Sequence, residues 1–349
     1  MSTSTAITIL ADDLSGAAEA AAAFLGRTPA PTLALHPGPM YQTGVTVVDL
    51  NTRTRSAPDA DSALRAALGT IGDDHLVLVK IDSLLRGHLG ATVDVLAERG
   101  PVIVAGGLPT LARTVRNGVL HIDGVPLHRT DLWHLEAAEA PHTIADLISG
   151  HTENCSSPAA ITAALARGAV AVCDISDDSD LDAVITVAHQ IPGVQLVGTS
   201  ALAAALARTL RPADTAAPDK IHYTTRILTV VGTGALNVTG QVAALIEHGA
   251  AHISVAAESL LAGTADSTGL TAALVAHPAV ALTVSGSAPA TQRFSLSGAL
   301  GRFVADADAQ ASIRPDLVLT GGETARSVID ALGLSALQPV GVVHHGAVV

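Results

Sequence analysis

The chain has 349 residues, of which 48% are hydrophobic and only 2% aromatic, so its core must be built mainly from Ala, Val, Leu and Ile. That composition favours helices packed on a β-sheet over a β-sandwich rich in Trp and Tyr. The formal net charge of −13 excludes a broad surface for nucleic acid or for acidic membranes, because both partners need an excess of Lys and Arg.

The N-terminus and the apolar runs predict a soluble protein of the cytoplasm. The first residues, MSTSTAITILADD, lack the basic and then apolar pattern of a signal peptide. Apolar runs are interrupted before they reach the ~18 residues of a membrane-spanning helix. Cys155 and Cys173 have no metal-binding spacing, and we expect them to be buried thiols in a reducing compartment.

In the first half of the chain, short apolar runs alternate with Ala-rich helical stretches. Strands are predicted at 6–11, 45–49, 76–80, 101–105, 169–173 and 194–198, and helices at 16–25, 60–69, 88–99, 158–167, 180–190 and 200–210. Continuous Val, Ile and Leu runs between helices indicate a mainly parallel sheet that is covered by helices on both faces.

Residues 211–220, RPADTAAPDK, combine two prolines with charged residues and are the predicted linker. The pattern restarts after them, with strands predicted at 227–231, 252–256, 279–284 and 316–319. The sequence therefore predicts an α/β protein of two domains, 1–210 and 221–349, each with a mainly parallel sheet flanked by helices. We expect the active site in the cleft between them.

Charged and polar side chains gather where the strands of the first half end. They are Asp12 and Asp13 after the first strand, Arg53 after the second, Lys80, Asp82, Ser83 and Arg86 at the third, and Arg113 and Asn117 in a polar loop after the fourth. Ligands of parallel sheets bind beyond the carboxyl ends of the strands, so we expect these side chains at one edge. Arg and Lys suit an anionic substrate, and a carboxylate can act as general base for a hydroxyl. One of the two aspartates could instead cap the following helix.

In the second half, the strands end in small residues: GTG (232–234), SGS (285–287) and TGGET (320–324). Free backbone N–H groups before a helix can bind phosphate oxygens, and three such strand ends in one domain favour a phosphate site over ordinary tight turns. The pattern is not a P-loop, and Asn237 breaks the dinucleotide fingerprint in GTGALN. The sequence assigns no metal ligands.

Five segments are similar, in order, to the signature segments of the four-carbon acid sugar kinases: ADDLSGA (11–17), KIDSLLRG (80–87), GLPTLARTVRNGVLHIDGVPL (107–127), VGTSALA (197–203) and TGGETA (320–325). The similarity extends over essentially the whole chain. The first two segments and the RxxxNGxLxxxGxPL pattern of the third are the most specific.

The resemblance implies an ATP-dependent kinase, a phosphotransferase with an alcohol acceptor, that phosphorylates the terminal hydroxyl of threonate, erythronate or a 3-oxo-tetronate with the help of Mg²⁺. It implies that 1–210 binds the sugar acid and that 221–349 binds ATP. The catalytic residues would be Asp13, Lys80, Asp82 and Arg86, and the substrate-binding residues Asp12, Arg53, Ser83, Arg113 and Asn117. The nucleotide would be held by Gly232, Thr233, Gly321, Gly322, Glu323 and Thr324.

Two aspartates are candidates for the general base. Asp82 lies near Lys80 and Arg86 in sequence, and these cations should keep its pKa low, so we expect it to organise substrate or metal. Asp13 has no adjacent cation in sequence and is the predicted base, while Lys80 and Arg86 would hold the substrate anion and the transferring phosphoryl group.

The sequence departs from the family pattern in two places. Family members continue into a Lys-Ala-Gly-Gly-Phe-Gly-like segment, whereas this sequence ends at HHGAVV, so that either the chain is shortened or its ATP site is incomplete. In addition, GTGALN replaces the usual Gly-Ser-x-Ser pattern. The sugar-acid half of the prediction is therefore the firmer half.

Two other functions stay open. The chain could be a sugar-acid-binding protein with an incomplete ATP site, or an NAD-dependent dehydrogenase or isomerase of similar acids, although the broken fingerprint opposes the latter. The stereochemistry of the acid and the oligomeric state, with a homodimer as one option, are also left open.

Overall fold

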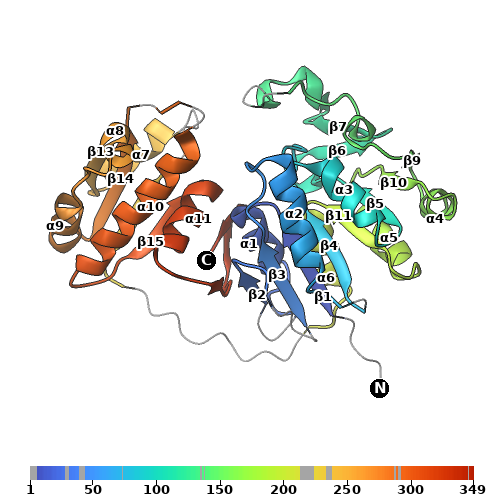
Figure 1. Ribbon diagram of the computed structural model, residues 1–349, viewed down its shortest axis with the longest axis horizontal. Coiled ribbons are helices and arrows are strands. Elements are labelled where there is room, and N and C mark those ends of the chain that lie inside the picture. The colour runs from blue at the N-terminus through green and yellow to red at the C-terminus, as the bar shows by residue number, and fades with distance from the viewer. Residues whose placement is uncertain are drawn as a thin grey trace. The chain divides into compact units, whose positions relative to one another are not determined.

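The structure, a computed structural model, describes residues 6–27, 31–38, 44–72, 74–133, 136, 138–212, 224–232, 238–286, 288–289, 292–344 and 346–349. The chain divides into two compact units (Figure 1). Unit 1 comprises Met1–Ala216 and Ala336–Val349, and unit 2 comprises Ala217–Ser335. Most of the predicted linker, 211–220, lies outside the described residues.

One large sheet runs through the described part of unit 1. Its strands, in spatial order, are β16 (Ala336–Leu337), β2 (Thr32–Ala34), β3 (Val45–Asp49), β1 (Ile7–Ala11), β4 (Leu76–Lys80), β11 (Gln195–Gly198), β5 (Val102–Ala105), β10 (Val170–Cys173) and β9 (Thr152–Cys155). These strands pair in parallel, except that β16 is antiparallel to β2. Every residue of β1 and β3 is buried, as expected of parallel strands covered on both faces.

Helices cover the sheet of unit 1. They are α1 (Leu14–Ala22), α2 (Ala57–Leu68), α3 (Leu89–Ala97), α4 (Pro158–Ala166), α5 (Asp178–Ala188) and α6 (Ser200–Arg208). Most begin at a side-chain cap, such as Ser56 before α2 and Asp177 before α5, as helix N-termini prefer. Helices α2 and α3 pack together, while α1, α6, α5 and α4 pack in a row. Because crossovers between parallel strands are right-handed, these two groups lie on opposite faces.

A β-hairpin stands where the sequence predicted a polar loop. It is formed by β6 (Arg113–Arg116), β7 (Val119–Ile122) and the short β8 (Val125–Pro126). The β6–β7 turn is Asn117–Gly118, both with positive φ (50° and 72°), which is the geometry of a two-residue hairpin turn. Val115 and Ile175 exchange backbone hydrogen bonds, which fix β6 to the loop that follows β10. Short 3₁₀ turns flank the hairpin at Pro109–Leu111, Leu127–Arg129, Asp131–Trp133 and Ile144–Leu147.

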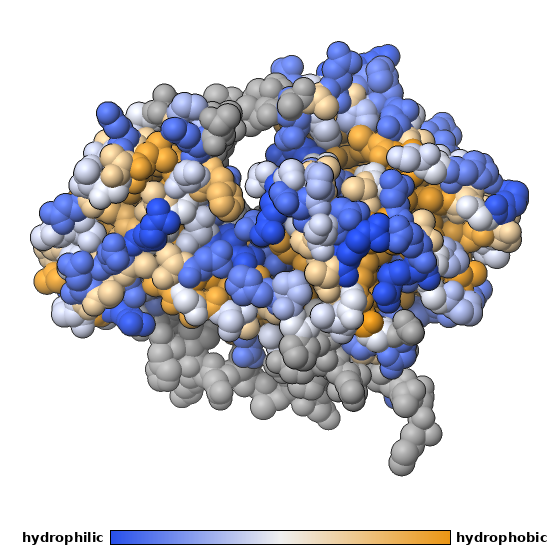
Figure 2. All heavy atoms as spheres, in the orientation of Figure 1, coloured by the Kyte–Doolittle hydropathy of each residue, from blue (hydrophilic) through white to orange (hydrophobic). Residues whose placement is uncertain are grey.

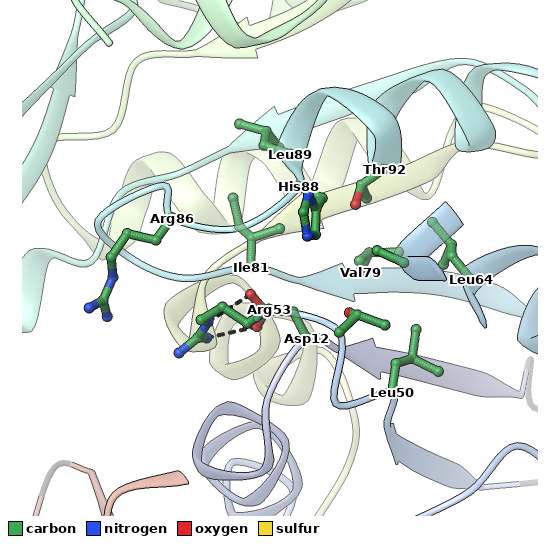
Figure 3. A pocket seen from close by; sticks show the side chains of 12 residues that line it. Asp12, Leu50, Arg53, Leu64, Val79, Ile81, Arg86, His88, Leu89 and Thr92 are labelled. Carbon is green, nitrogen blue, oxygen red and sulfur yellow. Dashed lines mark hydrogen bonds and ion pairs between the residues drawn. The ribbon is translucent and has the colours of Figure 1, made fainter. Parts of the chain in front are cut away.

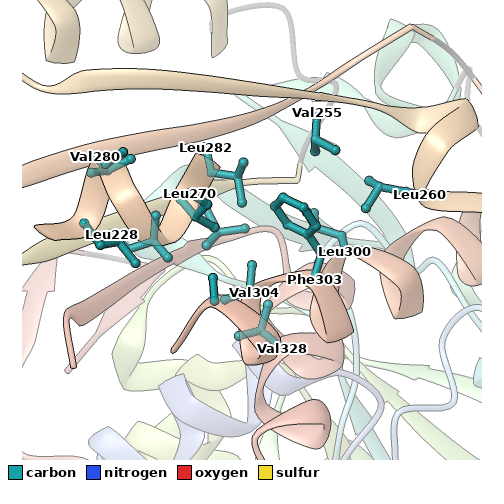
Figure 4. Close-up of a cluster of buried hydrophobic side chains, with 14 of the residues drawn as sticks. Leu228, Val255, Leu260, Leu270, Val280, Leu282, Leu300, Phe303, Val304 and Val328 are labelled. Atoms are coloured by element: carbon teal, nitrogen blue, oxygen red, sulfur yellow. The ribbon is translucent and has the colours of Figure 1, made fainter. Parts of the chain in front are cut away.

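Unit 2 has its own four described strands, in the order β13 (Ala251–Ala256), β14 (Ala279–Ser285), β12 (Ile227–Val231) and β15 (Asp316–Thr320), all parallel. Its helices are α7 (Val238–Glu247), α8 (Ala257–Leu261), α9 (Thr268–Ala276), α10 (Arg293–Gln310) and α11 (Gly322–Ala331). A separate hydrophobic core, which includes Leu228, Leu282 and Phe303, lies between the sheet and helices such as α10 (Figure 4).

The end of the chain returns to unit 1, which differs from the predicted assignment of 221–349 to a single C-terminal domain. Ala336 and Leu337 pair with Ala34 and Leu33, so β16 extends the large sheet beyond β2. The hairpin of β17 (Val342–His344) and β18 (Ala347–Val348) follows, and β18 packs against α1.

The described helices include none that is both long and apolar enough to span a bilayer. On the face shown in Figure 2, hydrophilic and hydrophobic residues are interspersed over both units.

Candidate active site

The predicted acid-sugar residues lie at a switch point of the unit 1 sheet. From β1 the chain runs to β2 and β3 on one side and then returns to β4 on the other. Ala11, the last residue of β1, is in register with Asp49 of β3 and with Lys80 of β4. The segments that follow these three strands therefore leave the same edge side by side, which is where open α/β sheets bind their ligands.

Arg53 joins the two carboxylates that follow β1. Its Nε and Nη2 donate to the two oxygens of Asp12 at 3.0 and 2.8 Å, and its Nη1 and Nη2 donate to the oxygens of Asp13 at 2.8 Å each. Figure 3 shows the Arg53–Asp12 pair beside Ile81 and Leu50. Burial acts to lower the pKa of Arg53, but the two aspartates raise it above its usual value, so the guanidinium stays charged.

Lys80 is buried at the end of β4, with its side chain only 7% exposed, and its Nζ lies 3.7 Å from Asp13 Oδ1. The same oxygen of Asp13 accepts the Gly16 N–H at 3.0 Å and so caps α1. Asp13 is thus both a helix cap and a member of the charged cluster. A Cβ on Gly16 would lie 1.9 Å from Lys80 Nζ, which explains why this position has no side chain.

Asp82 is held by a tight turn after β4. Its Oδ2 accepts the backbone N–H groups of Leu84 and Arg86, and the Arg86 guanidinium donates to both carboxylate oxygens at 2.7 and 2.8 Å. Leu85 adopts φ 62° within this turn, a conformation that costs energy for a bulky residue and often marks a functional segment. Burial acts to raise the pKa of Asp82, but Arg86 and Arg53 hold it well below its usual value.

The hairpin brings Arg113 to this cluster but not Asn117. Arg113 Nη1 donates to Ser83 Oγ, next to Asp82 in the chain. Asn117 lies in the hairpin turn, where its carbonyl accepts from Asn154 Nδ2 at 3.3 Å. Within the described residues, no hydrogen bond or ion pair joins Asn117 to the charged cluster.

A cavity of about 20 Å³ lies behind the Arg53–Asp12 pair, lined also by Ile81, Leu89 and His88 (Figure 3). This volume has room for about one water molecule. The cavity is therefore too small for a ligand larger than water.

In unit 2, the predicted nucleotide residues meet at the ends of β12 and β15. Val231 is in register with Thr320, so Gly232 and Gly321 leave the sheet side by side. A Cβ on Gly232 would lie 1.8 Å from Thr324 Oγ1, so the first turn of α11 packs directly on Gly232. Gly321 precedes α11 with φ 84°, and Gly322 and Glu323 form its first turn. Thr233 lies outside the described residues.

These two strands flank the switch point of the unit 2 sheet, because β13 and β14 lie on one side of β12 and β15 lies on the other. The N-terminus of α11 there presents backbone N–H groups and the positive end of the helix dipole, which suit an anion such as phosphate. Among the described residues, no group of three or more His, Cys, Asp or Glu side chains could hold a metal ion by itself.

The sequence interpretation missed the role of Gly16 and the contact between Ser83 and Arg113. A glycine in the first turn of a predicted helix could have indicated the role of Gly16. Glycine at such a position often marks the close approach of another group to the helix backbone. The dipeptides Asn117–Gly118 and Asp123–Gly124 were a signal for the hairpin that carries Arg113.

Comparison with known proteins finds similarity to a sugar-binding family and to kinases of sugar acids. Residues 7–206 match the family model of a sugar-binding N-terminal domain. The D-threonate kinase of Cupriavidus necator is 29% identical, over 95% of this chain and 86% of that protein. The D-erythronate kinase of Heliobacterium modesticaldum is also 29% identical, over 56% of this chain and 50% of that protein.

Solved structures share the fold. A crystal structure from Salmonella typhimurium LT2 has a TM-score of 0.75 at 20% identity and covers 98% of this chain and 91% of that one. A Bordetella bronchiseptica protein, crystallised as a domain-swapped dimer with bound citrate, has a TM-score of 0.52 at 25% identity and covers 94% of this chain and 86% of that one.

Proposed function

The chain belongs to the four-carbon acid sugar kinase family, and from this premise we propose that it transfers the γ-phosphoryl group of ATP to the terminal hydroxyl of a four-carbon sugar acid such as threonate, erythronate or a 3-oxo-tetronate. The observation that supports this most is the ion-paired cluster beyond β1, β3 and β4. It combines cations that suit a carboxylate with carboxylates that can accept a hydroxyl proton.

Within this proposal, Asp13 is the general base and Asp82 an anchor. Two backbone N–H groups and the Arg86 guanidinium fix Asp82, and its lowered pKa makes it a poor proton acceptor. Asp13 is oriented by its place at the N-cap of α1, and Lys80 and Arg53 contact its oxygens. An entering anion would draw these two cations toward itself and leave Asp13 available for the proton.

Unit 2 would bind ATP, with its phosphates at Gly232 and at the N-terminus of α11, where backbone N–H groups can stabilise negative charge. Mg²⁺ is usually held by phosphate oxygens together with one or two carboxylates, so the ion need not have a site made of protein side chains alone. When bound, it would neutralise charge on the phosphates.

A coupled ADP-release assay over D- and L-threonate, D- and L-erythronate and their 3-oxo forms tests the proposal. We expect turnover with at least one acid and loss of turnover in Asp13→Asn, with the affinity for the acid roughly intact. ATP binding by calorimetry is the companion measurement. Binding of an acid without binding of ATP would instead show a sugar-acid-binding protein.

A further inference from the structure

Asp49, the last residue of β3, carries a buried carboxylate outside the set of proposed site residues. It is only 1% exposed, and its Oδ1 accepts the backbone N–H of Asn51 at 2.8 Å. Burying a carboxylate costs free energy unless polar partners compensate it, so a buried acid at a strand end needs a physical explanation. The loop that follows β3, residues 50–53, provides one.

The loop 50–53 is held against the segment that follows β1. The backbone N–H groups of residues 50, 52 and 53 donate to the carbonyls of Ala11 and Asp12 at 2.9 to 3.1 Å. The N–H of Asn51 lies between these donors in the chain and goes to the Asp49 carboxylate instead. The side chain of Asp49 therefore fastens the middle of the loop, while backbone bonds fasten the residues around it.

Asn51 is the point at which the chain bends. It adopts φ 48°, in the left-handed region that residues other than glycine occupy uncommonly. A side-chain oxygen that accepts the N–H two residues later favours such local turns. The hydrogen bond from Asn51 to Asp49 therefore stabilises the bend that directs the chain from β3 to Arg53.

The guanidinium of Arg53 depends on this bend, because Arg53 follows Asn51 by two residues. It makes four hydrogen bonds with Asp12 and Asp13, and its Nη1 lies 3.6 Å from Asp82 Oδ1. A group that contacts three carboxylates at once tolerates little displacement, and a shift of about 1 Å in an active site can cost about 10²-fold in rate. Such groups rely on neighbouring hydrogen bonds to hold them.

Resting on the proposed function, we propose that Asp49 is a positioning residue of the sugar-acid site. Its carboxylate fixes the bend at Asn51 and thereby holds the Arg53 guanidinium in place. Asp49 acts here as a hydrogen-bond acceptor and contacts neither the acid nor the transferred phosphoryl group. Asp49→Asn retains an acceptor oxygen of the same shape, whereas Asp49→Ala removes it.

Calorimetry with D-threonate and D-erythronate, in the absence of ATP, measures acid binding. We expect Asp49→Ala to weaken it about 10-fold, the effect of one lost hydrogen bond, and Asp49→Asn to weaken it less than about threefold. Asp177→Ala is the matched control, because Asp177 Oδ1 likewise accepts the N–H two residues later, that of Ser179, at 2.8 Å, but at the exposed start of α5. It should change acid binding less than about twofold. Equal losses in Asp49→Ala and Asp49→Asn would overturn the role as an acceptor.

A double-mutant cycle tests whether Asp49 acts through Arg53. In the Arg53→Ala background, Asp49→Ala should weaken acid binding by less than about a further twofold, because the guanidinium that Asp49 positions is already gone. A further loss as large as that in the wild-type background would show that Asp49 acts independently of Arg53, and would overturn the inference.

The same cycle measured by urea unfolding needs no ligand. We expect the fall in the unfolding midpoint of the double variant to be smaller than the sum of the falls in the two single variants. Strict additivity would overturn the coupling. A wild-type chain that binds neither acid, or that binds one without releasing ADP when ATP is present, would refute the proposed function. The ligand-free cycle would then still decide whether Asp49 holds Arg53.

Discussion

At the carboxyl end of β4, the Asp82 carboxylate is surrounded by donors, two of them on the Arg86 guanidinium. These contacts keep its pKa in the folded chain below the ordinary aspartate value of about 4. A carboxyl group with a lowered folded-state pKa contributes stability that is fully present above its unfolded pKa. That stability is lost progressively as the pH falls through the folded-state value.

We predict that Arg86→Ala destabilises unit 1 by about 2 kcal/mol at pH 7, because the nearly buried Asp82 loses its main partner, although Arg86 itself is partly exposed. The difference from the wild-type chain should shrink between pH 5 and pH 3, where Asp82 of the variant becomes protonated. Urea unfolding at several pH values measures this. Arg65→Ala, which breaks an exposed pair with Glu98, is the control and should have a small effect. A loss for Arg86→Ala that is equally large at pH 7 and pH 3 would contradict the linkage.

A second prediction concerns the space that Gly16 leaves for Lys80. In Gly16→Ala the new Cβ would lie 1.9 Å from the present Nζ position, so the lysine must move. A displacement of about 1 Å in a catalytic group can lower kcat/KM about 10²-fold, and we expect a loss of that order.

Gly240→Ala is the matched control for this variant. Gly240 is likewise the third residue of its helix, α7, but a Cβ there would meet no atom of the described residues within 4 Å. It should leave kcat/KM unchanged and alter stability by no more than about 1 kcal/mol. Full activity in Gly16→Ala would show that the position of Lys80 is not critical.

At the scale of single residues, the sequence predicted which side chains lie near one another at the strand ends. It did not predict which atoms of these side chains are in contact. Asp13, Arg53 and Lys80 meet because parallel strands in register deliver their following residues to one edge. The Arg113–Ser83 contact depends on how the hairpin folds back over the sheet, which residue order along the chain does not specify.

At the scale of elements, strands formed by continuous apolar runs were the most predictable. The predicted strands at 45–49, 76–80 and 227–231 have the observed bounds of β3, β4 and β12, because such runs are typical of parallel strands. The strands β2 and β9 were missed. They are short and include polar residues, so their pairing depends on tertiary contacts rather than on a local pattern.

A prediction at this scale concerns the contact between Gly232, after β12, and the first turn of α11. Gly232→Ala would place a Cβ 1.8 Å from Thr324 Oγ1 and force the first turn of α11 away from β12. If this turn binds the phosphates, ATP affinity should fall at least about 10-fold, because the backbone N–H groups would no longer converge. Calorimetry with ATP measures the change, and acid binding to unit 1 should not alter.

Gly269→Ala in α9 is the control in the same unit, since within the described part of the chain a Cβ there meets nothing within 4 Å. It should bind ATP as the wild-type chain does. If Gly232→Ala also retained its ATP affinity, the nucleotide would have to be placed elsewhere.

At the scale of the whole molecule, the chain leaves unit 1 for unit 2 and then returns. The two residues of β16 complete the edge of the large sheet, and a strand of that length has no periodicity from which it could be predicted. The division into two α/β halves was visible in the restart of the strand pattern, whereas the return of 336–349 to unit 1 was not.

Because each unit has its own sheet and its own hydrophobic core, we predict that the two proposed ligands protect different parts of the chain. A ligand that binds only the folded state stabilises it by about 2.7 kcal/mol at a hundredfold excess over Kd, which corresponds to about 5–10 °C in Tm for a domain of this size. A four-carbon acid should therefore raise the transition of unit 1, and ATP with Mg²⁺ that of unit 2. Calorimetric scans combined with hydrogen exchange of peptides from β4 and β12 assign each shift. Slower exchange in β12 on addition of the acid alone would contradict the placement of the acid in unit 1.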